Sequence, residues 1–414
     1  MPLPAIKVTV NFSTGASFGQ AFLIGSGVFG QDVLADSSAL IVDVTSQVQS
    51  VNTVRGRNLL TEQFQTGTAT VVLADQLGYW NPQNSSSPYY GQLLPLRKIQ
   101  IAATDPTTSL TTNLFSGYIT SYNYRQSQDV GEVSTTTLTA LDATQLLTLA
   151  TVSTVTGAVA GETTGVRFGR ILDQIGWPSS LRDVDTGQTT VQANPTTART
   201  ATTALSQLAL TEFGAFYVDV DGAVVFQDRL LTSSSVAGTP TAFVDSGAGI
   251  RYSNAEFKLD DSQIFNEANV TAGAITATYK DTASVATYFL HTYDAPSLLM
   301  DTSANADSWA RAMVASRKDT SIRCDSITLN LNTPDYAAGV TAALTLDYFD
   351  PITVTQTQPG SSSITKTLQV FGVAHSINFG NSSWFTRLTT AEPIIDSFII
   401  GTDYGKLGVN VLSY

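Results

Sequence analysis

The side chains best suited to catalysis or metal binding are scarce in this chain, which contains two histidines and one cysteine. His291 lies three residues before Asp294, and His375 lies next to a serine. A Ser-His-Asp relay needs a nucleophile and an acid that converge on one histidine, and a zinc site needs several nitrogen or sulfur ligands. Both histidines lie in Thr/Ser-rich stretches typical of strands, where a histidine is usually a half-buried polar residue. Cys324, as the single cysteine, forms no internal disulfide.

Paired carboxylates are a second possible source of chemistry, since a glycosidase places two of them across a sugar. Asp260 and Asp261 are adjacent, and Asp347 and Asp350 are three residues apart. Proximity in the sequence does not place two carboxyl groups across a substrate. We therefore interpret both pairs as residues of turns or strand ends.

Three aromatic residues, Trp80, Tyr89 and Tyr90, flank a stretch rich in Asn, Ser and Pro. Such rings can stack on a carbohydrate, and they can equally anchor a loop against a folded sheet. The sequence leaves both interpretations open.

Two short motifs resemble ligand-binding loops. Residues 25–30 match the GxGxxG pattern of dinucleotide-binding proteins, but only a weak helical signal follows, so a glycine-rich loop is the better interpretation. Asp219-Val220-Asp221-Gly222 begins like an EF-hand loop, yet position twelve is Leu230 instead of a bidentate glutamate. Strands are predicted on both sides, so Asp221-Gly222 is interpreted as a hairpin turn.

Composition and charge narrow the functional classes further. Hydrophobic residues make up 43% of the 414 residues, enough to build sizeable cores, whereas charged residues make up only 13%. The formal net charge of −13 repels the phosphates of nucleic acid, so specific nucleic-acid binding is not expected. The sequence has neither the pattern of a secretion signal nor an apolar run of about 18 residues. We predict no enzymatic activity, no cofactor, no catalytic or metal-binding residues, and no membrane span.

The elements that must position all these residues are mostly strands. Threonine is abundant, and 30 glycines and 14 prolines supply turns. Alternating and β-branched stretches predict strands in two blocks, at residues 6–12, 68–73, 97–102 and 133–141, and at residues 263–279, 285–290, 322–331, 352–357, 364–379 and 384–390.

Helical periodicity lies between and within these two blocks. Apolar residues spaced three and four apart predict one helix that ends near Gly176 and a second that ends near Phe213. Around Asp221-Gly222, two apolar stretches predict a type I′ β-hairpin, because both turn residues accept a positive φ. A third helix is predicted at residues 303–318, and residues 230–245 are predicted to form a linker or long loop.

Three stretches, in the same order along the chain, resemble the minor tail proteins of long-tailed bacteriophages, a family of tail-tip or baseplate hub proteins. Together they cover much of the chain. They contain residues 55–57, 65–73, 78–82, 87–90 and 94–97, then residues 171–182, 185–187 and 212–229, and finally Trp384 to Leu388.

The resemblance implies a mainly β fold with α+β insertions, built from two tube-type β-barrel domains, a mixed α/β domain and a helical insertion. The first barrel is expected at residues 1–145, the mixed domain at 146–245, and the second barrel at 246–395 with the helical insertion near 296–320. Residues 396–414 are expected to form a C-terminal arm. This arm is apolar but interrupted by glycines, so it would be ordered against a neighbouring chain or fold back onto its own second barrel.

The function implied by the resemblance is that of a structural virion protein, synthesised in the bacterial cytoplasm and built into the tail tip. It would form a homotrimeric hub ring that closes the tail tube and seats the central fibre or spike. Its other expected partners are the tail tube or distal tail protein and the tape measure protein. Two alternatives remain: a hexameric distal tail protein, and a carbohydrate-binding receptor module. The ring passage is expected to be acidic or neutral, because a basic wall would hold passing DNA.

Overall fold

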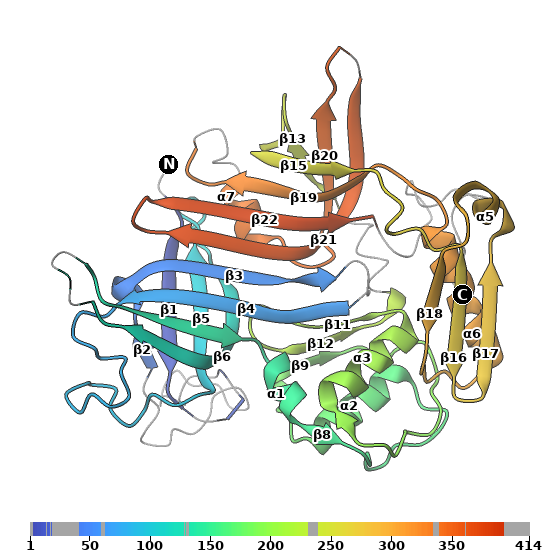
Figure 1. The fold of residues 1–414 in the computed structure, drawn as a ribbon, viewed down its shortest axis with the longest axis horizontal. Coiled ribbons are helices and arrows are strands. Elements are labelled where there is room, and N and C mark those ends of the chain that lie inside the picture. Colours follow the sequence, from blue (N-terminus) through green and yellow to red (C-terminus); the bar gives the residue numbers. More distant parts are fainter. Residues whose placement is uncertain are drawn as a thin grey trace.

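The computed structural model describes residues 3–13, 15–16, 18, 41–58, 63–127, 129, 132–230, 239–333, 339–360 and 362–392. The predicted glycine-rich loop at residues 25–30 and the predicted arm at residues 396–414 lie outside these residues. The described chain is mainly β: a large mixed sheet is flanked by a region with helices and by a small sheet covered by helices (Figure 1). No helix in the described residues is long and apolar enough to cross a membrane.

Seven strands form the N-terminal half of the large sheet, in the hydrogen-bonding order β2-β1-β5-β6-β7-β4-β3. Alternation of polar and apolar residues produces these strands: every second residue of β7 is buried, as expected for a strand with one face on a core. The strands are β1 Ala5–Asn11, β2 Ile41–Asp43, β3 Val48–Asn58, β4 Gln63–Ala74, β5 Arg97–Thr104, β6 Thr111–Arg125 and β7 Thr135–Leu141, with a 3₁₀ turn at Thr45–Gln47.

Seven later strands form the other half, in the order β14-β13-β20-β21-β22-β19-β15. When the strands of each half are numbered along the chain, with the inserted β16, β17 and β18 left aside, both halves have the order 2-1-5-6-7-4-3. The halves differ in that β13 is parallel to β20, whereas β1 is antiparallel to β5. The elements of this half are β13 Thr241–Val244, β14 Ile250–Arg251, β15 Asn254–Lys258, β19 Arg323–Asn330, α7 Gly339–Thr345, β20 Pro351–Thr357, β21 Ser363–Asn378 and β22 Ser383–Ala391.

Backbone hydrogen bonds join the two halves edge to edge. The first part of β21 pairs with β20, and its last part pairs with β22 on one side and with β3 on the other. The β21–β3 joint is antiparallel and runs from Gly372 opposite Gly56 to Asn378 opposite Ser50. An antiparallel run therefore extends through β6-β7-β4-β3-β21-β22-β19-β15, with four strands from each half.

The strands of the described residues do not close into a barrel, so the closed form of the two predicted β-barrels is corrected to one open, mixed sheet. The physical reason is that the edge strands do not pair with each other within one half, which a closed barrel would require. The outer edge of β3 bonds to β21 of the other half instead of to a strand of its own half. Among the described residues, β15 bonds only to β19, so the equivalent edge of the second half is also open.

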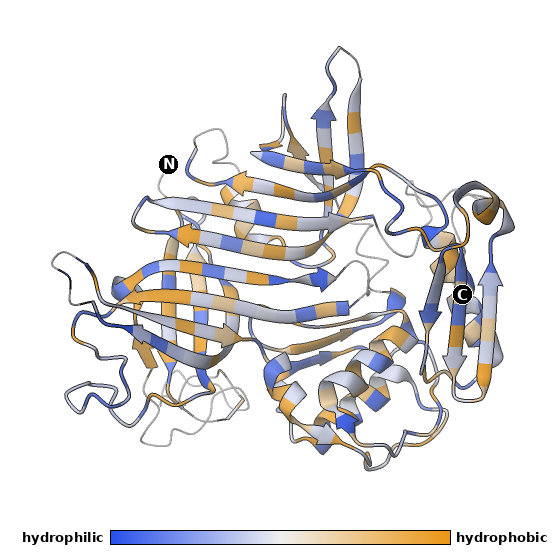
Figure 2. Ribbon diagram, viewed as in Figure 1, coloured by the Kyte–Doolittle hydropathy of each residue, from blue (hydrophilic) through white to orange (hydrophobic). Residues whose placement is uncertain are grey.

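One hydrophobic core lies against the covered face of this run and includes side chains of both halves. Val71 and Leu138 come from the first half, and Ile327, Val354 and Leu388 come from the second. Hydrophobic segments alternate with polar ones along the strands in Figure 2, which is the pattern of a sheet with one buried face. Burial of one such side chain stabilises a fold by about 1.5–3 kcal/mol, so the shared core binds the halves together in addition to the backbone joint.

A region with helices lies between the halves in the sequence. Both of its longer helices form where the periodicity predicts them, and Thr200 caps α3 by accepting a hydrogen bond from the Thr203 amide (3.1 Å). The elements are α1 Thr144–Leu149, β8 Thr151–Val152, α2 Thr164–Gln174, a 3₁₀ turn at Ser179–Leu181, β9 Arg182–Val184, β10 Arg199–Thr200, α3 Ala201–Glu212, β11 Ala215–Val218 and β12 Val224–Gln227.

The predicted hairpin is present as β11 and β12, but its turn is not of type I′. Val218 pairs with Val224, so residues 219–223 form the loop, and Gly222 (φ 88°) has a positive φ whereas Asp221 does not. The Asp219 carboxylate accepts from the amides of Asp221 (2.9 Å) and Ala223 (2.8 Å). The Asp219 side chain therefore organises a longer turn. In the calcium-loop pattern the same carboxylate would be the first ligand, but here it binds these two backbone amides.

A small sheet and two helices are inserted between β15 and β19. Its strands are β16 Glu267–Ala272, β17 Ile275–Lys280 and β18 Thr292–Ala295, and its helices are α5 Thr282–Tyr288 and α6 Ser303–Arg317. Helix α6 confirms the helix predicted at residues 303–318. The strand predicted at residues 285–290 is wrong, because Asp281 accepts from the amides of Ala283 and Ser284 and starts α5 there.

Candidate functional site

The eight-stranded run presents one open face. Elements that cover the core, including α7 and β1, lie behind the run in Figure 1, and no described element covers the opposite face. Rows of side chains cross this face where the strands pair. One row contains Thr139, Thr70, Asn52, Ser376 and Phe385, and the next contains Thr137, Val72, Ser50, Asn378 and Ser383.

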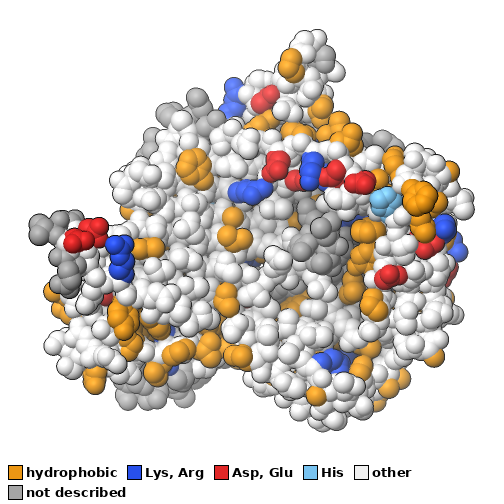
Figure 3. Space-filling view, viewed as in Figure 1, with side chains coloured by type: hydrophobic (Ala, Val, Ile, Leu, Met, Phe, Trp, Pro, Cys, Tyr) orange, Lys and Arg blue, Asp and Glu red, His pale blue; other side chains and the backbone are white. Residues whose placement is uncertain are grey.

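Hydroxyl and amide groups are the commonest side chains in these two rows, which also contain Val72 and Phe385. The adjacent row adds Ala374 and the exposed Val54, and charged groups lie toward the two ends of the face. At the β15 end, Arg387 donates to Glu256 (3.1 Å), and at the β6 end Arg125 donates to Glu132 (3.1 Å). Figure 3 shows a broad area without charged side chains and a row of charged side chains above it, at the level of β15 and β19. Such a face offers hydrogen bonds without a concentrated positive field, so it would not retain a phosphate backbone.

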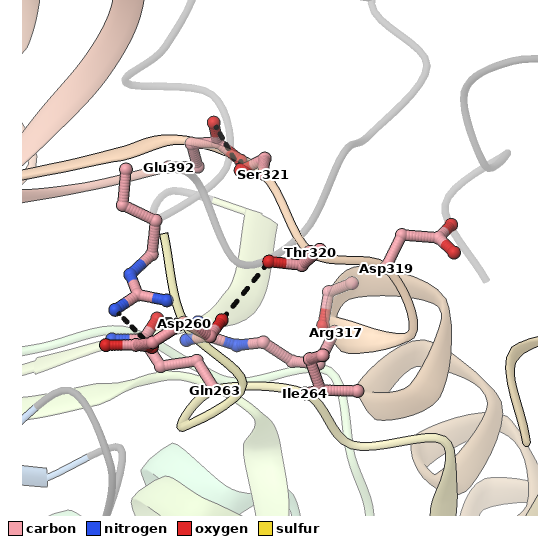
Figure 4. Close-up of a pocket in the computed structure, with 10 residues that line it drawn as sticks. Asp260, Gln263, Ile264, Arg317, Asp319, Thr320, Ser321 and Glu392 are labelled. Atoms are coloured by element: carbon pink, nitrogen blue, oxygen red, sulfur yellow. Dashed lines mark hydrogen bonds and ion pairs between the residues drawn. The ribbon is translucent and has the colours of Figure 1, made fainter. Parts of the chain in front are cut away.

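A small polar cavity of about 60 Å³ lies where β15 and β19 meet the inserted region (Figure 4). Arg323 donates to the Asp260 carboxylate (2.9 Å), the Thr320 hydroxyl donates to the Asp260 carbonyl (3.2 Å), and Arg317 donates to Gln263 (2.7 Å). Hydrogen bonds from Lys258, Ser262 and Arg323 lower the pKa of Asp260. The cavity has room for one or two waters. The Arg323–Asp260 ion pair joins β19 to the segment that leads from β15 into the insertion.

A second cavity, of about 220 Å³, lies along β1 and β5. Lys98 lines it and donates to the Ser13 hydroxyl (3.0 Å), and burial lowers the pKa of Lys98 to about 8. Its other lining residues include Lys7, Asn11 and Phe18. The cavity lies away from the two histidines and the paired carboxylates that the sequence singled out.

The two histidines lie far apart in the fold. His375 is buried in β21, where its Nδ1 lies 3.0 Å from the Thr386 hydroxyl and accepts from Trp384 Nε1 (3.4 Å). His291 follows α5, and its Nε2 lies 3.1 Å from the Tyr288 carbonyl oxygen. Cys324 is buried in β19, and burial raises the pKa of its thiol to about 11, so the thiol is neither ionised nor exposed.

The buried His375 makes stability depend on pH. Burial lowers its pKa to about 3, whereas an unfolded chain has a value of about 6.5, so the unfolded state binds the proton first as the pH falls. Relative to a His375→Asn variant, which keeps an acceptor near the Nδ1 position, the unmodified protein should lose about 2 kcal/mol between pH 7 and pH 5. Urea unfolding of both proteins at several pH values measures this difference in the free energy of unfolding. The contributions of the other titrating groups are the same in both proteins and cancel. A constant difference would contradict the assignment.

The remaining sequence candidates are engaged in the fold. Asp347 binds Arg55 (3.2 Å), and Asp350 accepts from the Asp347 amide (2.9 Å). Trp80 and Tyr89 are buried and Trp80 donates to Gln47 (2.9 Å), so these two rings anchor the loop, whereas Tyr90 is exposed. In the described residues no group of three or more His, Cys, Asp and Glu side chains could hold a metal ion. The open sheet face, which single-sequence patterns do not reveal, is what the fold assembles instead.

No family model matches the chain, and no curated protein matches its sequence. Two solved structures are similar to it over most of both chains. The tail protein from Neisseria meningitidis MC58 has 13% identity and a TM-score of 0.56, covering 94% of this chain and 97% of that chain. The 43 kDa tail protein of prophage MuSo2 from Shewanella oneidensis has 13% identity and a TM-score of 0.52, covering 86% and 96%. The resemblance in the sequence is therefore confirmed at the level of the fold: this chain has the fold of these two tail proteins.

Proposed function

We propose that this chain is a structural protein of a phage tail and forms the hub ring at the distal tip. The observation that carries the proposal is the repeated strand order, with the two halves joined into one continuous sheet. Each chain contains two equivalent units, so three copies of the chain contain six. A homotrimer of this kind matches a six-fold tail tube, which is the neighbour that the resemblance implies.

In this proposal the two halves are the tube-type domains predicted at residues 1–145 and 246–395. The second half starts earlier than predicted, at β13 (Thr241–Val244), so the mixed domain predicted at 146–245 ends before this strand. The insertion, predicted as a helical segment near 296–320, comprises β16 to α6. It is available for contacts with other components, and the arm predicted at residues 396–414 would add to them. The partners are the tail tube or distal tail protein, the tape measure protein, and the central fibre or spike. The protein acts in the virion and needs no chemistry of its own.

The open face of the eight-stranded run is the proposed wall of the ring passage. Its two central rows contain Thr, Ser and Asn together with Val72 and Phe385 and have no charged side chain, which agrees with the expectation of an acidic or neutral wall. A neutral wall would let DNA slide, because phosphate groups find no concentrated lysine or arginine to bind. The carbohydrate-binding alternative has less support, since Trp80 and Tyr89 are buried.

The mass of the assembled ring tests this function and separates it from the distal tail protein. Native mass spectrometry of the purified full chain is expected to give an assembly of three copies, because each copy supplies two of the six equivalent units. An assembly of six copies would instead favour the distal tail protein. A chain that stays monomeric at high concentration would contradict a ring-forming role.

A further inference from the structure

The eight-stranded run ends at two strand edges that pair with no further strand among the described residues. Within the described residues, no backbone hydrogen bond joins β15 to a strand other than β19. At the other end, β5 pairs with β6 only as far as Ile119, so Ser121–Arg125 of β6 bond to β7 on one side alone. Open edges of this kind are templates for pairing with another chain.

The joint between the halves shows which contact these edges can make. At the joint, the last part of β21 pairs with the outer edge of β3. In the repeated order, β6 takes the place of β21 and β15 takes the place of β3. The two open edges are therefore the same pair of edges that already meet once within the chain. Because one edge differs from the other, copies can join head to tail and close into a ring.

The β-bulges align the two halves residue by residue. The bulge between β6 and β7 falls just before Ser121, and the bulge between β21 and β22 falls just before Gly372. Ser121 therefore corresponds to Gly372. Arg125 and Ser376 each lie four residues further on, so they correspond as well.

Strand pairing carries the same alignment to the other edge. Ser121 is opposite Thr139, which is opposite Thr70, which is opposite Asn52. In the second half the same path from Gly372 leads through Thr389 and Ser326 to Glu256. Glu256 therefore corresponds to Asn52. Since Ser376 lies opposite Asn52 in the joint, a repeat of the joint between two copies places Arg125 opposite Glu256.

The side chains at the two edges are complementary in this register. Arg125 and Glu256 carry opposite charges and are 76% and 55% exposed. On the core-facing side, the same register places the exposed Tyr124 opposite the half-buried Phe257. An opposite-charge pair and an aromatic pair directly across two strands are both stabilising contacts.

We infer that β15 of one copy pairs, antiparallel, with the end of β6 in the next copy, with Glu256 opposite Arg125 and Lys258 opposite Asn123. This inference rests on the proposed ring and names the partner surface as a second copy of the chain. The ring proposal does not depend on this contact, because a ring could also form through other surfaces, such as the inserted region.

Disulfide trapping tests the edges and the ring separately. The variants are Arg125→Cys, Glu256→Cys and the double variant, all in the full chain, whose native Cys324 is buried. After oxidation with copper phenanthroline, neither single variant should cross-link alone, a 1:1 mixture should give dimers, and the double variant should give a linked trimer. A Thr70→Cys variant mixed with Glu256→Cys is the matched control, because Thr70 shares the face but lies away from the edge. This control mixture should give no dimer.

Each other outcome overturns one of the two proposals. A three-copy native mass without cross-links in the mixture would reject the edge pairing and keep the ring. Self-linked Arg125→Cys would show a two-fold contact and reject head-to-tail pairing. A linked series that closes at six copies would keep the edge pairing and reject the trimer, and a chain that stays monomeric would reject both.

Charge exchange supplies a second measurement that needs no disulfide. Arg125→Glu or Glu256→Arg alone should weaken self-association about tenfold at low salt, because like charges then face each other across the joint. The double exchange should restore association to within about twofold. Circular dichroism melts check that each variant folds. Single exchanges without any effect would contradict the register.

Discussion

Replacement of Arg55 by alanine is expected to destabilise the protein by about 3 kcal/mol, because it removes the buried cation at which three parts of the fold meet. The Arg55 side chain is only 5% exposed and comes from β3. It donates to the Asp347 carboxylate (3.2 Å), which follows α7, and to the Val218 carbonyl (3.2 Å) at the end of β11. Its guanidinium also lies 4.7 Å from the centre of the Tyr348 ring.

Loss of this cation would leave the Val218 carbonyl and the partly exposed Asp347 carboxylate without their donor, so the contact between sheet and helical region would weaken. Urea unfolding of the variant measures the effect. Arg311→Ala is the matched control, since that side chain is 58% exposed and its loss should change the free energy of unfolding by less than about 1 kcal/mol. Equal effects of the two substitutions would show that Arg55 is not a junction residue.

Two glycines of the same helix should respond to alanine in opposite directions. A Cβ atom on Gly165, in the first turn of α2, would lie 1.7 Å from the Asp185 carbonyl oxygen and 2.6 Å from that of Thr186. The helix would have to move away from this backbone, so Gly165→Ala should destabilise by about 3 kcal/mol. A Cβ atom on Gly169 meets nothing within 4 Å, so Gly169→Ala should stabilise by about 0.5–1 kcal/mol through helix propensity.

Thermal unfolding of the two variants compares them directly, because composition and helix are the same in both. The melting temperature should fall for Gly165→Ala and rise for Gly169→Ala. A similar shift in both variants would mean that α2 does not pack closely against residues 185–186.

Helices and strands were predictable where the spacing of apolar residues alone determined the element. The apolar stripes of α2 and α3 and the alternation of β7 lie within a dozen residues each, and each of these elements formed where expected. The prediction failed where a single side chain decided the local structure. Asp281 starts α5 in a stretch whose composition suggested a strand, and Asp219 replaces a two-residue turn by a longer one.

The candidate site could not be predicted in the same way, because it consists of a face shared by strands that are distant in the sequence. Ser50 and Asn378 are neighbours on that face although more than 300 residues separate them. Their hydrogen bonds are made by backbone groups, which every sequence supplies, so no residue type signals the pairing. The expectation of an acidic or neutral passage came from the net charge of −13, and it stays a prediction.

By itself the sequence determined the β-rich character and the positions of the three longer helices, because composition and short-range periodicity are local properties. Tertiary structure alone decided that the halves repeat one strand order, that β3 gives its edge to β21 instead of closing a barrel, and that β15 and the end of β6 remain open. These features depend on which strand edges meet. Edge pairing is selected by the packing of a common core and by chain geometry, since the backbone hydrogen bonds themselves are the same for every pair of strands.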